Sequence, residues 1–335
     1  MGHIIFSENS RLNDSIYGRV EAPIKSFITK RGEQFEAESL IDKIFDTQKS
    51  THWAESYGSM TAMEGFKNVG ENGEYPVTGY QEGYSQIIDN PTWKNSFSIS
   101  KEIIDDGKII ELKSRPEAFV ASYYRTRERF GAAHIGAAIK GTDVVFEGKT
   151  YSIKSADKQN VFSKTHPSKV KGGNQSNLFA DAFSETVLDY AESAMQDFKD
   201  DDGNILDIAP DTIIIPNLPA LKKAVFAAIG SDKDPSTANN AFNYQYGRWN
   251  VIVWHYLNQF ITSGTAPWIL MDSDANKRYH GAIWQDREDL TIKYRVDEDN
   301  DATIWSGRAR FNIGFADWRP MAVFGVAGGT QLVSA

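Results

Sequence analysis

The chain of 335 residues contains no cysteine and carries a formal net charge of −9, with 41% hydrophobic residues. The lack of thiols excludes disulfides, cysteine catalysis and cysteine metal sites, and the acidic balance argues against direct reading of a DNA sequence. No run approaches the ~20 apolar residues of a membrane span, and the first residues lack the apolar core of a secretion signal. We therefore expect a protein without a membrane partner, made in the cytoplasm, that buries a large core in one or two domains.

Residues 1–58 predict an arm rather than a domain. They show no strong periodicity before 38–45, where four apolar residues share a short helical face, and Pro23 and Gly32 interrupt the rest. Such a segment does not build its own core. We expect it to be either disordered or strapped across something else.

The stretch 64–106 predicts a long hairpin with a glycine-rich polar tip at 69–79. In the returning run, Trp93, Phe97 and Ile99 alternate with polar residues, which indicates a strand with one covered face. Pro91 separates this strand from the one before it. Because a two-stranded ribbon is marginal by itself in water, something must cover its apolar side chains. Two readings stay open: the ribbon folds back on its own domain, or it lies on a neighbouring subunit.

A long helix is predicted from a cap at Ser114 to about Lys140, with Pro116 in its first turn and Gly141 as its C-cap. Its apolar face and its outward residues follow helical spacing. The inward set is Phe119, Tyr123, Phe130, Ala133 and Ala137, and the outward set is Arg125, Glu128 and Arg129. At ~1.5 Å per residue the helix is about 37 Å long and serves as a spine.

The later segments predict two further units. A tight turn at Glu147-Gly148 indicates a hairpin over 144–153, which a polar loop follows. A helix with an acidic outer stripe over 179–198, strands at 212–215 and 251–254, and a helix capped by Asn217 indicate an α/β subdomain. Long antiparallel strands at 290–296 and 305–315, with a return at 321–326, are expected to pack on the spine helix.

Motifs for chemistry are weak. Gly148-Lys149-Thr150 imitates a phosphate loop, but Asp143 stands where the pattern needs another glycine. A calcium-loop start at 272–276 fails because Lys277 occupies the glycine position.

Other polar candidates have structural readings. His134 lies near the apolar face of the spine and predicts a hydrogen-bonded core histidine, and the acidic clusters 200–202 and 297–301 predict solvated turns. We therefore predict no catalytic, cofactor-binding or metal-binding residues.

Five segments, in their order along the chain, carry a family resemblance: NVGENGEYP at 68–76, FSISKEIIDD at 97–106, IIPNLPAL at 214–221, WIL at 268–270 and RARFNIGFADWR at 308–319. They resemble the major capsid protein of tailed bacteriophages, and more narrowly the Mu-like major head subunit, over roughly residues 38–328.

This resemblance implies an α+β fold with named parts. These are an N-terminal arm (1–58), an extended E-loop (59–100), a peripheral domain with the spine helix and long antiparallel strands (101–180 and 289–335) and an α/β axial domain around hexamer and pentamer centres (181–288). It also implies that the E-loop tip, Asn72, Gly73, Glu74, Tyr75 and Pro76, contacts a neighbouring subunit.

The resemblance implies a structural, non-enzymatic function as well. Copies of the chain would self-assemble into the icosahedral shell of a virion, made in the bacterial host cytoplasm, that encloses double-stranded DNA. A portal and a separate scaffolding protein are the expected partners, because the short arm lacks a long helical scaffold pattern. DNA would be held non-specifically, since an acidic lining lets it slide.

Two other functions remain as alternatives. An encapsulin-like compartment would bind a cargo peptide. A soluble α/β enzyme would show a deep pocket in which carboxylates of perturbed pKa converge.

Overall fold

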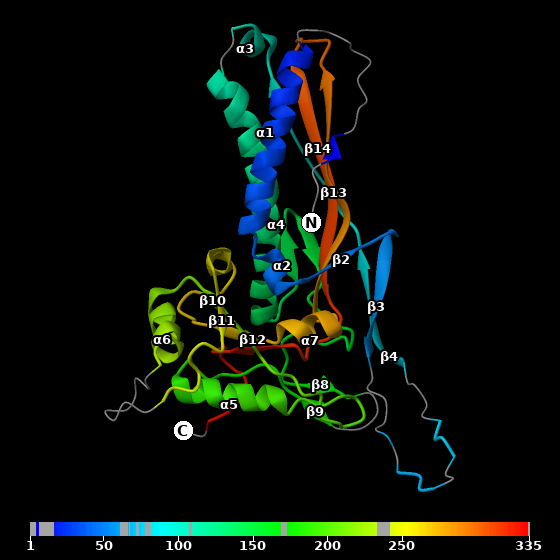
Figure 1. The fold of residues 1–335 in the computed structure, drawn as a ribbon, viewed down its shortest axis with the longest axis vertical. Helices are drawn as coiled ribbons and strands as arrows, with labels where there is room; N and C mark the ends of the chain where they lie inside the picture. The colour runs from blue at the N-terminus through cyan, green and yellow to red at the C-terminus, as the bar shows by residue number, and fades with distance from the viewer. Residues whose placement is uncertain are drawn as a thin grey trace.

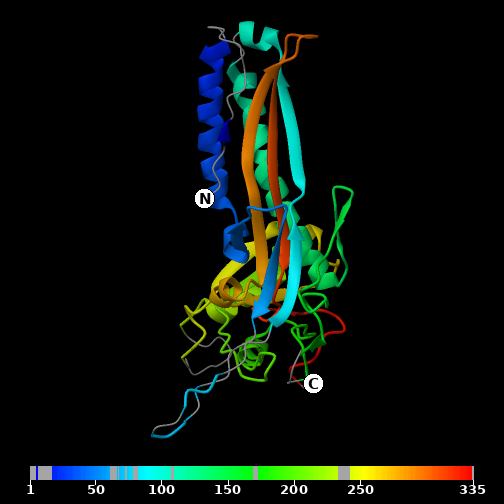
Figure 2. The ribbon, with the colours of Figure 1, turned by 90° about the vertical axis from the view of Figure 1, so that its right-hand side faces the viewer.

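The computed structural model of the chain describes residues 5–6, 17–60, 66, 68–71, 74–77, 82–106, 109–168, 173–232 and 242–333. The molecule is elongated, with two long helices and two long strands running along its upper part and a second, smaller sheet with flanking helices below (Figure 1). A two-stranded ribbon leaves the lower part of the long sheet and projects from the body (Figure 2). Among the described residues, no helix is both long enough and apolar enough to cross a membrane.

The larger sheet has the order β1–β13–β14–β5, and β2 pairs with another part of β13. β13 and β14 run antiparallel along most of their lengths, and β5 pairs antiparallel with β14 at the edge. Its strands are β1 (Ile5–Phe6), β2 (Asp46–Lys49), β5 (Thr92–Ile99), β13 (Ala282–Val296) and β14 (Thr303–Phe315). The predicted long antiparallel strands are thus confirmed.

The spine helix α4 (Ile109–Lys140) covers one face of this sheet, as predicted. It begins before Ser114, so Ser114 lies within the helix and is not its N-cap, and Pro116 is inside the helix. Gly141 follows the last turn with φ +70°, which a glycine adopts without strain. Short helices α2 (Ile41–Ile44) and α3 (Lys101–Asp105) lie near the two ends of the spine (Figure 1).

Helix α1 (Tyr17–Glu38) was not predicted, and it runs through both Pro23 and Gly32. It lies along α4 (Figure 2), where Ile24 and Ile28 are buried in one cluster with residues of α4 and the large sheet. The helix therefore depends on tertiary packing of an apolar stripe more than on local propensity. Of the two alternatives expected for this segment, the described part of it is strapped across another element and is not disordered.

The smaller sheet has the order β11–β10–β12–β15. Its strands are β10 (Thr212–Pro216), β11 (Asn250–Trp254), β12 (Trp268–Met271) and β15 (Met321–Phe324), and its helices are α5 (Glu185–Gln196), α6 (Pro219–Ile229), η1 (His255–Gln259) and α7 (Ser273–Arg278). β15 was expected to return along the long strands, but it pairs with β12 instead. The α/β unit predicted from strand and helix alternation is confirmed.

Two helix starts differ from the predictions. α5 begins after Ser184, whose hydroxyl accepts a hydrogen bond from the Val187 amide, so Phe179 precedes the helix and stacks on Phe324. α6 begins with Pro219 after Leu218, and Asn217 does not cap it. Asn217 is held through its backbone by Asn258 instead.

Two small hairpins complete the fold. The hairpin of β6 (Val144–Phe146) and β7 (Lys149–Tyr151) confirms the predicted turn, in which Glu147 and Gly148 both have positive φ, as a type I′ turn requires. β8 (His166–Pro167) and β9 (Asn174–Gln175) pair within the predicted polar loop.

His134 is the predicted core histidine: its side chain is fully buried, and its Nδ1 lies 2.9 Å from the Phe130 carbonyl oxygen. Burial lowers the pKa of His134 from 6.5 to about 4. The unfolded chain therefore takes up this proton near pH 6.5 and the folded chain only near pH 4, so stability falls as the pH drops through that window.

We expect His134 to lower the free energy of unfolding of the isolated chain by about 3 kcal/mol between pH 6.5 and pH 4. Urea unfolding of the protein and of His134→Met at both pH values measures this drop in stability. The drop should be about 3 kcal/mol smaller in the variant, which has no imidazole to protonate. Equal losses in the two proteins would contradict the assignment.

Candidate assembly interface

The ribbon consists of β3 (Ala54–Met60) and β4 (Glu82–Asp89), paired antiparallel from Ala54 opposite Asp89 outward. The sequence predicted a hairpin here, with extended runs at 80–88 and 93–100, and assigned the regular return strand to 93–100. That strand is β5, which belongs to the large sheet. The projecting ribbon is therefore shorter than the hairpin expected from the sequence.

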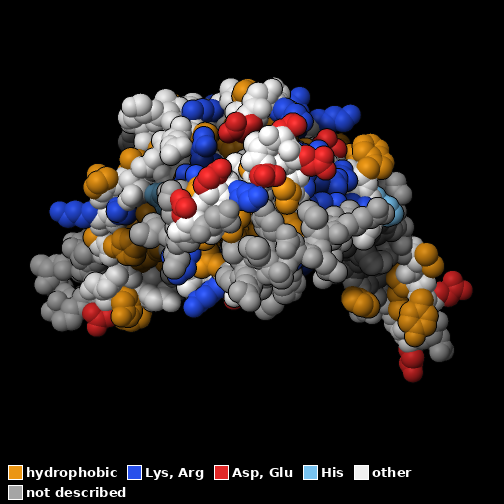
Figure 3. All heavy atoms as spheres, turned by 90° about the horizontal axis from the view of Figure 1, so that it is seen from above, with side chains coloured by type: hydrophobic (Ala, Val, Ile, Leu, Met, Phe, Trp, Pro, Cys, Tyr) orange, Lys and Arg blue, Asp and Glu red, His pale blue; other side chains and the backbone are white. Residues whose placement is uncertain are grey.

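The outer end of the ribbon carries apolar side chains that its own chain leaves exposed. Phe66, Tyr75 and Val77 are almost fully exposed, Tyr75 at 96% and Val77 at 98%. Figure 3 shows apolar groups on the projecting end standing clear of the body, with acidic groups beside them. Of the predicted contact residues, Glu74, Tyr75 and Pro76 are exposed here, and Asn72 and Gly73 lie outside the described residues.

An apolar contact fixes the root of the ribbon, which we define as the junction of β4 with the large sheet. Ile88 is 3% exposed and packs with Ile283 and Ala316. It lies directly over Gly314 of β14, where a Cβ atom would come within 2.2 Å of the Ile88 Cδ1 atom. Gly314 therefore provides the space in which the ribbon is seated.

Side-chain amides hold the root from both sides. Asn90 donates to the Ser50 hydroxyl at 2.9 Å and to the His52 carbonyl at 3.0 Å, while its own oxygen accepts from Gln285 at 2.8 Å. Asn312 donates to the Asp89 carbonyl at 2.9 Å. Because these bonds join the ends of β2, β4, β13 and β14, they limit rotation of the ribbon about its root.

The start of β3 is held in the same way. The Glu55 carboxylate accepts hydrogen bonds from the Thr51 amide, the Ser50 hydroxyl and the His52 amide, and these bonds lower the pKa of Glu55. Sequence reasoning missed this root. Its one visible signal is the Asp89-Asn90-Pro91 break, which the sequence analysis used to separate two strands.

One acidic cluster departs from its prediction as a solvated turn. Asp201 is 2% exposed and pairs with Arg319 at 2.9 Å, and Arg319 also pairs with Asp317 at 2.7 Å. Asp200 is fully buried and accepts hydrogen bonds from the Asp202 and Asn204 amides. These carboxylates are buried because they have partners: the Arg319 guanidinium in the turn after β14 pairs with Asp201, and backbone amides donate to Asp200.

A second buried group of polar side chains is also closed to solvent. His166 lies between Asp157, at 2.6 Å, and Asn177, at 3.0 Å, and its ring stacks on Trp318. Burial raises the pKa of Asp157, but hydrogen bonds from His166, Ser155 and the Gln159 amide outweigh it and leave this pKa below its usual range. In the described part of the chain, no three His, Asp or Glu side chains gather as a metal site requires.

The family comparison decides what kind of protein this architecture belongs to. A family model described as phage capsid protein matches residues 84–324, well over half of the chain. The chain belongs to this phage capsid protein family. The matched segment of the capsid protein begins within β4 and ends with β15, so it includes the spine helix, the long strands of the larger sheet and the whole smaller sheet.

One solved capsid structure shares the fold of the chain at low sequence identity, and other phage structures resemble it less closely. The capsid of Ralstonia phage GP4 matches with a TM-score of 0.53 and 8% identity, covering 84% of this chain and 86% of that one. A procapsid of bacteriophage JBD30 matches with a TM-score of 0.47 and 15% identity over 91% and 74% of the two chains. A structure from Mycobacterium phage Adephagia matches with 0.49 and 12% over 89% and 91%. No curated protein sequence matches the chain.

The α+β fold of the capsid protein is thus the tailed-phage major capsid fold predicted from the sequence. The protein is a structural, non-enzymatic major capsid component of the virion, and a shell assembled from many copies follows from that role. Neither the encapsulin-like compartment nor the soluble enzyme is favoured by these findings.

Proposed function

We propose that this major capsid protein is of the Mu-like type and builds an icosahedral shell of hexamers and pentamers around double-stranded DNA, with the ribbon as the arm that each subunit lays on a neighbour. The observation that supports this role is the contrast between the two ends of the ribbon. Its root is fixed by Ile88 and a network of amides, whereas Tyr75 and Val77 at its far end are 96% and 98% exposed. A soluble protein seldom exposes such a group of apolar side chains unless a partner covers it.

The proposed parts of the subunit follow the resemblance of the sequence to tailed-phage capsid proteins. We assign 1–58 to the N-terminal arm, 59–100 to the E-loop, 101–180 with 289–335 to the peripheral domain, and 181–288 to the axial domain at the capsomer centres. The pairing of β5 and β15 crosses these limits, since β5 lies in the large sheet and β15 in the small one.

Other partners belong to the same proposal. A scaffolding protein and a portal would act during assembly, which would take place in the host cytoplasm. The formal net charge of −9 is compatible with packaged DNA that is confined without tight phosphate contacts.

Deleting residues 70–78 tests the role of the ribbon. We expect the variant to fold with an unchanged circular dichroism spectrum but to form no closed shells, because the partner contact is removed while the root is intact. Electron microscopy and sedimentation of the expressed protein measure this, and Val145→Ser, at a residue 72% exposed on the β6–β7 hairpin, is the matched surface control. Normal shells from the deletion variant would overturn the proposal.

A further inference from the structure

Three polar side chains of the large sheet converge on residues 89–90 at the root of the ribbon. Gln285 of β13 donates from its Nε2 atom to the Asn90 Oδ1 atom at 2.8 Å. Asn312 of β14 donates from its Nδ2 atom to the Asp89 carbonyl oxygen at 2.9 Å. Arg310, also on β14, donates from its Nη2 atom to the Asn90 carbonyl oxygen at 2.7 Å. Each side chain thus holds the same short stretch by one of its polar atoms.

The second polar atom of each side chain is buried and has no hydrogen-bond partner among the described residues. These atoms are Gln285 Oε1, Asn312 Oδ1 and Arg310 Nε. Gln285 is fully buried and Asn312 is 4% exposed, so bulk solvent does not reach their oxygens. Because buried polar atoms in folded proteins are nearly always paired, three unpaired ones at one place indicate a common partner.

The register of the sheet places the three atoms on one face. Gln285 lies directly opposite Asn312 in the antiparallel pair of β13 and β14, so their side chains point to the same side. Arg310 precedes Asn312 by two residues on β14 and shares that side. Arg310 Nε makes no direct hydrogen bond to either oxygen. The contact among the three is therefore one that a small molecule can mediate.

The orientation of both amides is fixed, which settles the chemistry of the site. Gln285 Nε2 faces the Ile88 carbonyl oxygen at 3.2 Å as well as Asn90 Oδ1, and both of these atoms are acceptors. Asn312 Nδ2 faces the carbonyl and carboxylate oxygens of Asp89. Turning either amide over would set oxygen against oxygen. The site therefore offers two acceptors and one donor.

This set of two acceptors and one donor matches water and no ion. A metal ion would be repelled by the Arg310 guanidinium, which stays protonated and whose Nε–H cannot act as a ligand. An anion would face the two amide oxygens. A water molecule can donate to both oxygens and accept from Nε–H, and three such bonds are typical of a buried water.

We propose that the root of the ribbon binds one water molecule, which donates to Gln285 Oε1 and Asn312 Oδ1 and accepts from Arg310 Nε–H. The water joins side chains that already hold residues 89–90, so the separate hydrogen bonds become one network that strengthens its members. Ile88 and Asn90 at the same root are 3% and 5% exposed, which keeps the site closed to solvent. The inference concerns the single subunit and does not depend on what the ribbon binds.

A map that resolves ordered waters tests the site directly. Electron cryomicroscopy of the shell, or crystallography of the unassembled subunit, should show one peak at hydrogen-bond distance, about 2.7–3.2 Å, from all three atoms. A side chain of a neighbouring subunit in that place would overturn the proposal. So would a well-ordered root in which the three atoms have no partner.

Nuclear Overhauser spectra of the unassembled subunit give a second readout, in solution. A water held at the site should give a cross-peak to the side-chain amide protons of Asn312. Asn177 is the matched control: it is fully buried, its Nδ2 donates to three carbonyl oxygens, and its Oδ1 accepts from the Ser163 amide. The absence of a cross-peak at Asn312, or one of equal strength at Asn177, would contradict the assignment.

Two arginine variants separate this site from water elsewhere near the strand. Arg310→Met removes the donor to the water oxygen and should weaken the cross-peak at Asn312 about fivefold, as expected for one lost hydrogen bond. Arg308→Met should leave the cross-peak unchanged, because Arg308 lies two residues earlier on the same face, is 48% exposed and pairs with Glu288.

Gln285→Met, which removes one acceptor, is the second variant in case Arg310→Met does not fold. It should weaken the cross-peak at Asn312 by a similar factor. A cross-peak that neither variant changes would show that the water lies outside this site, and the proposal would be wrong.

Discussion

Replacing Asp286 by alanine is expected to lower the free energy of unfolding of the unassembled capsid subunit by about 3–5 kcal/mol. Asp286 lies on β13 with its side chain 5% exposed, and it accepts two hydrogen bonds from Arg127 of the spine helix, at 2.8 Å and 3.1 Å. Its Oδ1 also accepts from the Trp284 indole at 2.9 Å. The pair thus joins the spine helix to the longest strand of the sheet.

The expected loss is large because of what surrounds Arg127. Its guanidinium lies over the Trp284 ring, 4.5 Å from the ring centroid, and near the Phe311 ring at 5.3 Å. Without Asp286, the cation stays among aromatic rings with no anion to balance it, and the desolvation cost is no longer offset. The remaining cation–π contacts recover only part of that cost.

Urea unfolding, followed by tryptophan fluorescence on unassembled subunits, measures this effect. Adding Arg127→Met to Asp286→Ala should recover part of the loss, because the double variant leaves no unpaired charge. Lys101→Ala removes a cation that is 49% exposed and pairs with Asp301 at 3.7 Å, and it should cost less than about 1 kcal/mol. A loss of that small size for Asp286→Ala would show that the pair does not hold the helix to the sheet.

The elements that the sequence predicted well are those with a long, regular apolar pattern. The strands β13 and β14 and the spine helix repeat their period over enough residues for one face to be recognised. Helix α1 lacks this signal. Its buried residues Ile24 and Ile28 form a short stripe between Pro23 and Gly32, and this stripe becomes meaningful only against α4.

Pairing partners were harder to predict than the strands themselves. The alternation at 93–100 correctly indicated a strand with one covered face, but a period of two does not say which strand lies beside it. β5 pairs with β14, more than 200 residues later in the chain, through Trp305 opposite Phe97. The true partner of β4 is β3, whose residues 54–60 show no strong alternation of apolar side chains.

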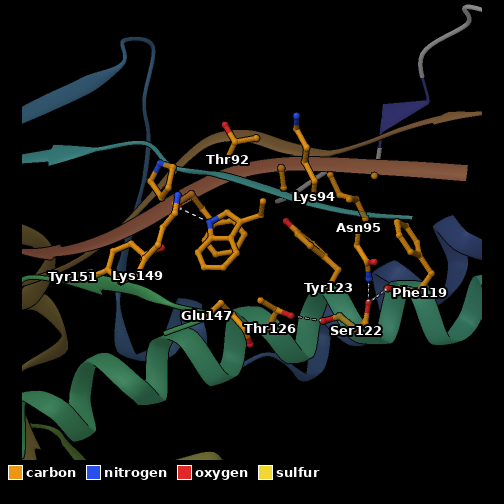
Figure 4. Close-up of a pocket in the computed structure, with 16 residues that line it drawn as sticks. Thr92, Lys94, Asn95, Phe119, Ser122, Tyr123, Thr126, Glu147, Lys149 and Tyr151 are labelled. Atoms are coloured by element: carbon orange, nitrogen blue, oxygen red, sulfur yellow. Dashed lines mark hydrogen bonds between the residues drawn. The ribbon is translucent and has the colours of Figure 1, made fainter. Parts of the chain in front are cut away.

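The proposed assembly surface was also predicted only in part. The sequence indicated the ribbon end, because glycines and exposed polar residues gather at 69–79. It did not indicate the root, because Asn90, Gln285 and Asn312 are brought together from three distant segments. A pocket of about 440 Å³ between β5, α4 and the β6–β7 hairpin (Figure 4) was missed for a related reason: Gly307 and Ala309 create space only where α4 crosses them.

The acidic cluster at 200–202 shows that a sequence pattern does not reveal whether a charge is buried. The second large effect is expected at Arg319, which pairs with this cluster. Arg319 is 6% exposed and holds Asp317 at 2.7 Å, Asp201 at 2.9 Å and the Lys199 carbonyl at 3.0 Å. Replacing Arg319 by methionine should lower the unfolding free energy by about 3–5 kcal/mol, because two nearly buried carboxylates then face each other without a cation.

The size of this effect depends on the geometry of the guanidinium as well as on its charge. Arg319→Lys keeps the charge but not the three directed donors, so it should lose less than Arg319→Met and still fall below the unaltered subunit. Arg278→Ala, which breaks an exposed pair with Asp274, should change stability by less than about 1 kcal/mol. Chemical unfolding ranks the three variants by their free energy of unfolding. If Arg319→Met is as stable as Arg278→Ala, the buried group of Arg319, Asp317 and Asp201 does not stabilise the junction between the turn after β14 and the end of α5. Because that junction ties β15 and the small sheet to the long strands, a subunit that loses it should also assemble poorly at temperatures where the unaltered protein still forms shells.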